Sequence, residues 1–276
     1  MPLADRFDGL LIDLDGVVWI GREPVPGSPE ALRALLDAGK RLVFVTNNPG
    51  KHPAAYAERL AEMGAAVNEA QIVTAGMVVA RLAGEAAAAG EAGGSAFVIG
   101  APALKEMVAA TGARVLDGTD GREADAVVVS GHRGFDYGEL LTAKRALDRG
   151  AALFATSHDP TMPFPGGEVP GTGAVLAAVE TASGKRATIA GKPERHLFEM
   201  AREALACSFS LDANEKEQAN QRVAMVGDRL TSDIEGGRRA GLETILVLSG
   251  TTTRAEAEAA RPAPDFVVEN LSGLLA

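Results

Sequence analysis

The stretch LLIDLDG at residues 10–16 is an apolar run that ends in two carboxylates. The run Leu10–Leu14 has the length and composition of a buried strand. Asp13 and Asp15 are two residues apart, so on a strand they project to the same side. Burial of both carboxylates inside a sheet is costly, which places them at its carboxyl edge, where open α/β sheets bind ligands. Such a pair can hold a divalent cation, can act as nucleophile and acid/base, or can simply flank a turn.

Beyond this stretch the chain repeats one kind of joint: a helical pattern, then a glycine, then a short apolar run. In residues 32–45, leucines at helical spacing precede Gly39, and LVFV at residues 42–45 follows it. Glycine after a helix adopts the left-handed cap at low steric cost, and short apolar runs between helices are typical of a parallel sheet. The same joint recurs at Gly64, Gly112, Gly150 and Gly241. The pattern therefore predicts an α/β protein.

The composition excludes several classes of protein. The chain has 276 residues, 46% of them hydrophobic, and a formal net charge of −10. It is therefore globular, and its acidic balance argues against nucleic acid or an anionic membrane as a partner. We expect no signal peptide, because residues 1–9 contain Asp5 and Asp8 and no apolar run, and no membrane span, because no apolar stretch approaches ~20 residues. A cytoplasmic location is therefore the default expectation. The single cysteine, Cys207, excludes an intrachain disulfide, and we expect it to be a small buried hydrophobe on a helix.

Other apolar runs also end in polar residues, namely Thr46 with Asn47, Lys192, and Asp228 with Asp233. Taken one at a time, each has an ordinary explanation in turn chemistry, a solvated surface lysine or a helix N-cap. A core sheet, however, brings the carboxyl ends of its strands together on one edge. Combined with Asp13 and Asp15, these residues then supply acids, a lysine and a hydroxyl. That set predicts a Mg²⁺-assisted phosphoryl-transfer site with an aspartate nucleophile.

These four segments, in this order, resemble the motifs of the haloacid dehalogenase superfamily. Nearly the whole chain looks like the NagD/p-nitrophenylphosphatase branch of that superfamily, which carries a large cap between the second and third motifs. The resemblance implies a doubly wound, Rossmann-like parallel sheet in a core at residues 1–82 and 187–276. It also implies an inserted α/β cap domain at residues 83–186. Residues 83–95 and 181–186 are rich in small or polar residues, as joints between domains are.

The resemblance also implies roles for the acidic residues. Asp13 would be the nucleophile and would become an aspartyl phosphate, and Asp15 would be the general acid and then the general base. Mg²⁺ would be held by the Asp13 carboxylate, the Asp15 backbone carbonyl and Asp228, with Asp233 orienting that shell from behind. Dehalogenase members lack the acid two residues after the nucleophile, so Asp15 indicates a phosphatase or a phosphomutase.

Further roles concern the phosphate and the leaving group. By resemblance, Thr46 and Asn47 would bind phosphoryl oxygens, and Lys192 would neutralise charge on both Asp13 and the phosphate. His158 in the cap would be a candidate for recognition of the leaving group. The lone tryptophan, Trp19, is expected to pack where a short flap meets the core, rather than to stack on a substrate.

We therefore expect a Mg²⁺-dependent phosphatase that acts on a small-molecule phosphomonoester. Phosphoglycolate, pyridoxal phosphate, nucleotide monophosphates and sugar phosphates all lie within the range of the branch. The alternatives are a phosphotransferase or mutase, and a protein that binds a phosphorylated ligand on the same fold without turnover. A signalling receiver domain also uses an aspartate, a lysine and a hydroxyl, but the length and the cap-sized insertion argue against it. Relatives often associate through the cap, so a homodimer through that domain is a further expectation.

Overall fold

The computed structural model describes residues 1–89, 94–164, 167–207 and 222–276. The chain forms two compact units, and each is described by itself. The first, which we call the core unit, comprises Met1–Thr46, Pro53–Val73 and Lys192–Ala276. The second, the inserted unit, comprises Asn47–His52 and Thr74–Gly191.

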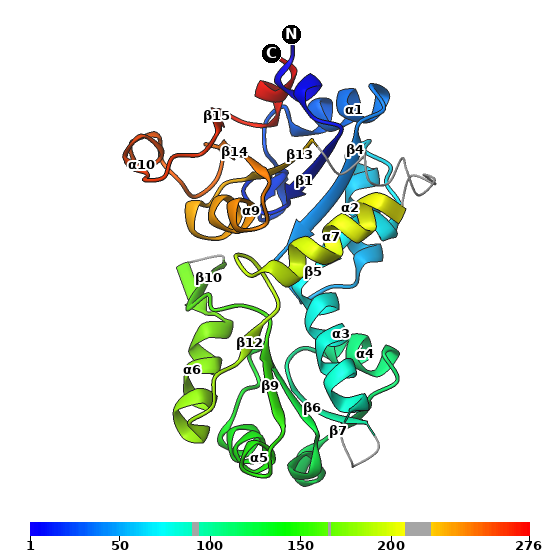
Figure 1. Cartoon of the computed structure of the whole chain (residues 1–276), viewed down its shortest axis with the longest axis vertical. Coiled ribbons are helices and arrows are strands. Elements are labelled where there is room, and N and C mark those ends of the chain that lie inside the picture. The colour runs from blue at the N-terminus through cyan, green and yellow to red at the C-terminus, as the bar shows by residue number, and fades with distance from the viewer. Residues whose placement is uncertain (90–93, 165–166, 208–221) are drawn as a thin grey trace. The chain divides into compact units, whose positions relative to one another are not determined.

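The core unit is built on a six-stranded sheet in the order β15-β14-β13-β1-β4-β5 (Figure 1). Its strands are β1 (Gly9–Asp13), β4 (Arg41–Thr46), β5 (Ile72–Thr74), β13 (Val223–Gly227), β14 (Glu243–Val247) and β15 (Phe266–Val268). β1 runs parallel to β4 and β13, and β14 runs parallel to β13 and β15. The chain adds strands outward from β1 through β4 and, in the opposite direction, from β13 through β14. This reversal confirms a doubly wound sheet, and it puts the ligand-binding crevice at the carboxyl ends of β1 and β13.

Helices and a short flap complete the core unit. Its helical segments are α1 (Ser28–Asp37), α2 (Pro53–Glu62), α7 (Arg195–Cys207), α9 (Glu235–Arg239), α10 (Arg254–Ala259), η1 (Leu3–Arg6), η2 (Glu69–Gln71), η4 (Leu230–Ile234) and η5 (Leu271–Leu275). The flap is an antiparallel hairpin of β2 (Trp19–Ile20) and β3 (Glu23–Pro24), which directly follows the loop after β1.

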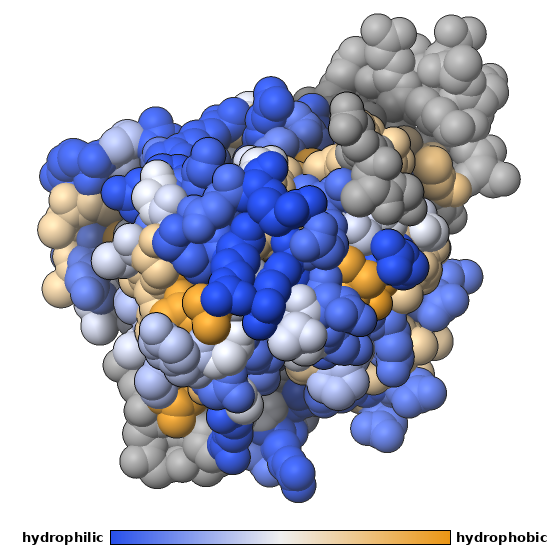
Figure 2. Space-filling model, turned by 90° about the horizontal axis from the view of Figure 1, so that it is seen from below, coloured by the Kyte–Doolittle hydropathy of each residue, from blue (hydrophilic) through white to orange (hydrophobic). Residues whose placement is uncertain are grey.

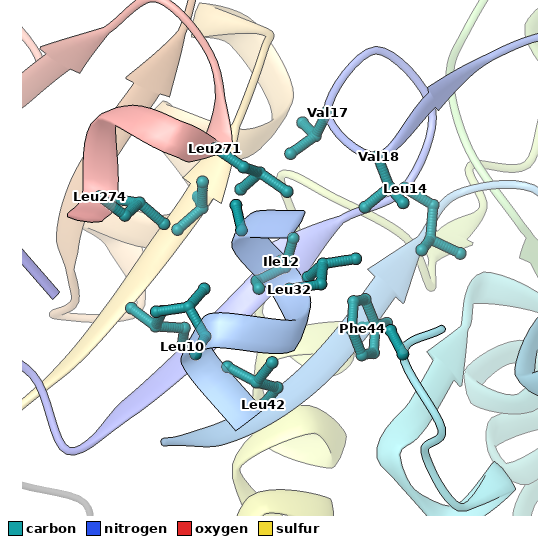
Figure 3. Packing of buried hydrophobic residues seen from close by; sticks show 14 of the residues in the cluster. Leu10, Ile12, Leu14, Val17, Val18, Leu32, Leu42, Phe44, Leu271 and Leu274 are labelled. Carbon is teal, nitrogen blue, oxygen red and sulfur yellow. The ribbon is translucent and has the colours of Figure 1, made fainter. Parts of the chain in front are cut away.

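Both faces of the core sheet are covered. Alternate residues of a strand share a face, so Leu10 and Ile12 of β1 point to one side, where Figure 3 shows them with Leu32 of α1. On the other side, a Cβ added at Gly9 would lie 2.7 Å from a methyl carbon of Leu205 in α7. Every residue of β1 is buried, so Asp13, its final residue, is shielded from solvent.

The inserted unit has its own parallel sheet, in the order β12-β9-β8-β6-β7. Its strands are β6 (Ser95–Ile99), β7 (Arg114–Leu116), β8 (Ala126–Val129), β9 (Ala152–Ala155) and β12 (Thr188–Ile189), with a separate hairpin of β10 (Thr161–Phe164) and β11 (Gly167–Pro170). Its helical segments are α3 (Ala75–Ala88), α4 (Pro102–Ala110), α5 (Tyr137–Asp148), α6 (Thr172–Ser183) and η3 (Gly118–Glu123). This is the α/β architecture that was expected of the inserted region.

The predicted insertion, residues 83–186, lies within the inserted unit, but that unit extends further at both ends. A boundary after residue 82 would cut α3, which begins at Ala75, capped by the Thr74 side chain, and belongs to the inserted unit throughout. At the other end, the strand before Lys192, expected in the core sheet, is β12 and pairs with β9 of the inserted sheet. Strand pairing and the continuity of one helix therefore decide both limits.

Hydrophobic side chains are mostly interior. The exposed large ones among the described residues are dispersed over the chain, at Met1, Ile20, Tyr137, Val267 and Leu275. The face seen in Figure 2 is mostly hydrophilic, with its hydrophobic residues in small separate spots. In the part of the chain that the structure describes, no helix combines the length and apolarity needed to cross a bilayer.

The expectation for Cys207 is wrong, because this residue is exposed at the end of α7. The buried residues of α7 are Leu197, Phe198, Ala201 and Leu205, a stripe with a period of three to four residues. Cys207 is two residues past the last of them, which turns its side chain to the opposite side of the helix.

Candidate active site

The structure brings together Asp13, Lys192, Asp228 and Asp233, all of them buried. Lys192 Nζ lies 2.6 Å from Asp13 Oδ1 and 2.6 Å from Asp233 Oδ1. Carboxylate oxygens of Asp13, Asp228 and Asp233 lie within 4.8 Å of one another. Of the four residues expected to converge at the carboxyl edge of one sheet, namely Asp13, Asp15, Asp228 and Lys192, the structure brings together Asp13, Asp228 and Lys192.

The sheet itself sets this geometry. Ile12 of β1 pairs with Val226 of β13, so Asp13 comes level with Gly227 and Asp228 lies one position beyond. Asp233 returns to the same place because η4 is a π-helical turn, and its Oδ2 accepts a hydrogen bond from the Arg229 backbone N–H at 3.0 Å. Both oxygens of Asp233 are thus engaged, one by this amide and one by Lys192.

The electrostatics of the cluster favour a cation. Three carboxylates share one ammonium, which leaves two negative charges uncompensated when all four groups are ionised. Burial raises the pKa of Asp13 well above its usual value, with Asp233 and Asp228 adding to the rise and Lys192 opposing it. Burial also raises the pKa of Asp228, and Asp233 adds to that rise. Burial alone would lower the pKa of Lys192. The adjacent Asp13 and Asp233 outweigh the effect of burial, and the pKa of Lys192 is raised. A divalent cation would relieve the mutual repulsion of the carboxylates, which adds to the rise in the pKa of Asp13 and of Asp228.

The donor set fits Mg²⁺, which prefers carboxylate oxygens. Asp228 Oδ2 accepts a hydrogen bond from the Thr251 backbone N–H at 2.6 Å. Within the described part of the chain, the other oxygen of Asp228, Oδ1, is buried and has no hydrogen-bond partner. A buried, unpartnered carboxylate oxygen is expensive, and coordination of a metal ion satisfies it.

Two glycines leave the space that Asp228 occupies. A Cβ added at Gly16 would lie 2.5 Å from Asp228 Oδ2, and one added at Gly250 would lie 2.1 Å from the same atom. Gly16 also has a φ of 90°, which disfavours other residues. The loop that carries Gly250 follows β14, and Ser249 Oγ donates to the Gly16 backbone carbonyl at 2.8 Å. This loop, residues 249–251, holds Asp228 against the end of β1, and it was missed in the sequence.

We expect Gly250→Ala to weaken Mg²⁺ binding by about 10- to 100-fold, because the new methyl group displaces the Asp228 carboxylate. The measurement is the rise in melting temperature as Mg²⁺ is titrated into the protein. Gly273→Ala is the control, since its Cβ would also be crowded, at 2.7 Å from Val268 Cβ in the same unit. An unchanged Mg²⁺ titration in the Gly250 variant would contradict this role.

Two other predicted residues lie at the same edge of the core sheet. Thr46 is buried at the end of β4, one residue beyond Val45, which pairs with Asp13. Asp15 is exposed on the loop after β1, and its Oδ1 accepts a hydrogen bond from Trp19 Nε1 at 3.0 Å. Trp19 itself is buried, as expected, but its hydrogen bond to Asp15 was not foreseen.

The two remaining predicted residues, Asn47 and His158, belong to the inserted unit. Asn47 Nδ2 donates to Asp159 Oδ2 at 3.5 Å. His158 is exposed on the loop after β9. That loop is tied to the start of α6, where Gly173 N donates to the Asp159 carbonyl at 2.8 Å. These two residues are therefore grouped with each other in the inserted unit.

One sequence signal could have found the missed loop. The run after β14 is an apolar strand followed by small polar residues, SGTTT at 249–253, as in the segments that were singled out. It carries no ionisable group, and its contribution is a backbone N–H and an absent side chain. The glycine is visible in the sequence, but its contact with Asp228 is not, and the backbone N–H has no signal in residue type.

Comparisons with known proteins agree with this geometry. Residues 10–114 match the family model of haloacid dehalogenase-like hydrolases, and residues 189–274 match a second model of HAD-like hydrolases. Mouse chronophin is 37% identical over 97% of this chain and 91% of its own length.

Two solved structures are similar over all or nearly all of the chain. One is glycerol phosphate phosphatase from Mycobacterium tuberculosis in complex with magnesium, with a TM-score of 0.85, 33% identity and coverage of 100% of this chain and 78% of that one. The other is p-nitrophenyl phosphatase from Archaeoglobus fulgidus, with a TM-score of 0.83, 30% identity and coverage of 97% and 98%. With the sheet, the acidic cluster and these relatives in agreement, the chain belongs to the haloacid dehalogenase-like hydrolases, in the branch that contains the p-nitrophenyl phosphatases and NagD.

Proposed function

We propose that this protein is a Mg²⁺-dependent phosphomonoesterase that uses Asp13 as its nucleophile and acts on a small phosphorylated metabolite. The observation that carries the proposal is the buried cluster at the switch point of the sheet. There Lys192 lies 2.6 Å from Asp13, and Asp228 presents a buried oxygen that has no hydrogen-bond partner among the described residues. The two solved structures named above are phosphatases, and one of them is a complex with magnesium.

In the first step, a carboxylate oxygen of Asp13 forms a bond to phosphorus. The bond between phosphorus and the ester oxygen breaks, and both of its electrons leave with that oxygen. Asp15 in its acid form gives its proton to the departing alkoxide. The products of this step are the free alcohol, an aspartyl phosphate on Asp13 and an ionised Asp15.

In the second step, Asp15 takes a proton from a water molecule whose oxygen attacks phosphorus. The bond between phosphorus and Asp13 breaks, and its electrons return to the carboxylate. Inorganic phosphate is released, Asp13 is regenerated, and Asp15 holds the proton for the next cycle. Each group thus ends the cycle in the state in which it began.

The remaining residues counter negative charge. Lys192 neutralises Asp13, which lets a carboxylate approach an anionic phosphate, and Asp233 holds Lys192 in place at 2.6 Å. Thr46 and Asn47 would donate hydrogen bonds to the phosphoryl oxygens. Asp13, Asp228 and the Asp15 backbone carbonyl would hold Mg²⁺. When bound, this ion supplies positive charge to the carboxylates and to the phosphoryl group.

For the substrate, we infer a small alkyl phosphate of the glycerol phosphate kind. A relative with 35% identity over 99% of this chain is the D-glycerol 3-phosphate phosphatase of Mycobacterium tuberculosis. His158 of the inserted unit is the proposed recognition residue for the leaving group. A homodimer through the inserted unit and a cytoplasmic location stay predictions.

The test is phosphate release from glycerol phosphate, p-nitrophenyl phosphate, phosphoglycolate, a nucleoside monophosphate and a sugar phosphate. We expect release with Mg²⁺, loss of release to background with EDTA, and recovery when Mg²⁺ is restored, because the cluster carries uncompensated negative charge without the ion. Release that resists EDTA would contradict the metal requirement. A folded protein that binds these esters without releasing phosphate would favour the binding or transferase alternatives.

A further inference from the structure

We propose that Trp19 is a positioning residue for Asp15, and that its indole N–H holds this carboxyl group where it can protonate the leaving group. The inference rests on the function proposed above and adds a residue to it. Trp19 is 1% exposed, whereas Asp15 is exposed, and Trp19 Nε1 donates to Asp15 Oδ1 at 3.0 Å. An indole has one donor and no acceptor, so this contact uses its full hydrogen-bonding capacity.

The indole ring is itself held on a rigid element. Tyr56 of α2 lies parallel to it, with an interplanar angle of 3° and ring centroids 6.4 Å apart. The Arg59 guanidinium carbon, one turn further along α2, lies 3.9 Å from the centroid of the indole. Arg59 Nη2 also donates to the Gly21 carbonyl at 2.8 Å, which ties the flap to the same helix. The ring therefore cannot rotate without disturbing both neighbours.

The backbone brings the two side chains together independently of the ring. Gly16 N donates to the Trp19 carbonyl at 2.7 Å, and Trp19 N donates to the Leu14 carbonyl at 3.2 Å. Asp15 and Trp19 form an isolated β-bridge across this turn. Turn and ring thus both set the distance between the donor and the carboxylate.

An exposed aspartate that acts as a general acid needs a hydrogen bond that fixes its orientation. On a solvated loop its side chain exchanges among rotamers, and a general acid acts only when it lies within hydrogen-bond reach of the leaving oxygen. Misplacement of a catalytic group by about 1 Å can cost on the order of 100-fold in rate. One fixed donor from a buried ring restricts Asp15 to a single orientation.

The alternative is that Trp19 only packs the flap. The dependence of the rate on the leaving group distinguishes this packing role from a positioning role. An alkoxide is a strong base and must receive a proton as it departs, whereas p-nitrophenolate is stabilised by resonance and leaves without one. The value of kcat/KM reports steps up to departure of the leaving group, so it isolates the proton donation by Asp15. A packing defect would lower kcat/KM for both substrates by the same factor.

The experiment compares kcat/KM for glycerol phosphate and p-nitrophenyl phosphate in the wild type and in Trp19→Phe, which keeps an aromatic ring and removes the N–H. We expect Trp19→Phe to lower kcat/KM for the alkyl ester by about 10- to 100-fold more than it lowers kcat/KM for the nitrophenyl ester. In an Asp15→Asn background, Trp19→Phe should cost nothing further on the alkyl ester, because the group it positions is gone.

Val18→Ala is the matched control, since Val18 is buried in the same loop and does not contact Asp15 through a hydrogen bond in the described structure. Val18→Ala should lower the melting temperature and change kcat/KM for both esters by the same factor. If Trp19→Phe does not fold, the lone tryptophan can be replaced by 3-benzothienylalanine, which has sulfur in place of the N–H and nearly the same shape.

An equal loss on both esters, or a full additional loss in the Asp15→Asn background, would overturn the role of Trp19. Absence of turnover on either ester in the wild type would instead overturn the proposed function. The two failures are therefore distinguishable.

Discussion

Replacement of Asp13 by asparagine should lower phosphate release by about 10⁴-fold or more, because the amide cannot form the aspartyl phosphate. The measurement is release from the best ester of the panel at saturating Mg²⁺. Asp8→Asn is the matched control: Asp8 precedes the same strand, and its carboxylate is paired with Arg222 at 2.6 Å. Substantial turnover by the Asp13 variant would remove this residue from the chemistry.

The same variant should stay folded, and its melting temperature in EDTA should not fall. The pKa of Asp13 is raised by burial, so the folded state holds this proton more tightly than the unfolded chain does. Above the ordinary pKa of an aspartate, ionisation of this group therefore favours unfolding, and asparagine removes that contribution. The uncompensated charge of the cluster falls from two to one. A clear drop in melting temperature would mean that the ion pair with Lys192 outweighs this repulsion.

Lys192→Met should remove most of the activity and, in EDTA, destabilise the fold by about 3–5 kcal/mol. Methionine has a similar length and no charge, so three buried carboxylates would lose the ammonium that now lies 2.6 Å from two of them. Urea unfolding in EDTA measures the free energy of unfolding, and phosphate release measures the activity.

The control for this variant is Lys144→Met. Lys144 forms an ion pair with Asp148, but both side chains are more than one-third exposed. Such a pair contributes about 0.3–0.5 kcal/mol. A change in the Lys192 variant no larger than that of the control would show that its charge does not stabilise the cluster. Mg²⁺ should restore part of the lost stability, because it supplies positive charge to the same carboxylates.

Much of the candidate active site was predictable, because its residues stand where apolar strands end. Asp13, Thr46 and Asp228 each follow such a run, and a parallel sheet gathers strand ends on one edge. The strand before Lys192 was placed in the wrong sheet, since strand pairing is not visible in a local pattern. The position of Lys192 beside Asp13 was nevertheless anticipated.

The features that were not predicted depend on backbone groups or on contacts between elements that are distant in the sequence. Gly250 matters because it has no side chain where Asp228 needs room, and Thr251 because its backbone N–H meets a carboxylate. Trp19 was expected to pack and does so, but the direction of its N–H depends on Tyr56 and Arg59 of another element. No residue type encodes such an orientation.

The sequence by itself determined the α/β class, the residues of the candidate site and the family. The class and the candidate residues follow from hydrophobic periodicity and residue type, which are local properties of the chain, and the family follows from the resemblance of four motifs. Only the tertiary structure decided which strands share a sheet, which helix belongs to which unit, and how the carboxylates share one lysine. Lys192 and Asp13 are 179 residues apart, and their 2.6 Å contact exists because packing of the whole core unit offsets the cost of burying those charges.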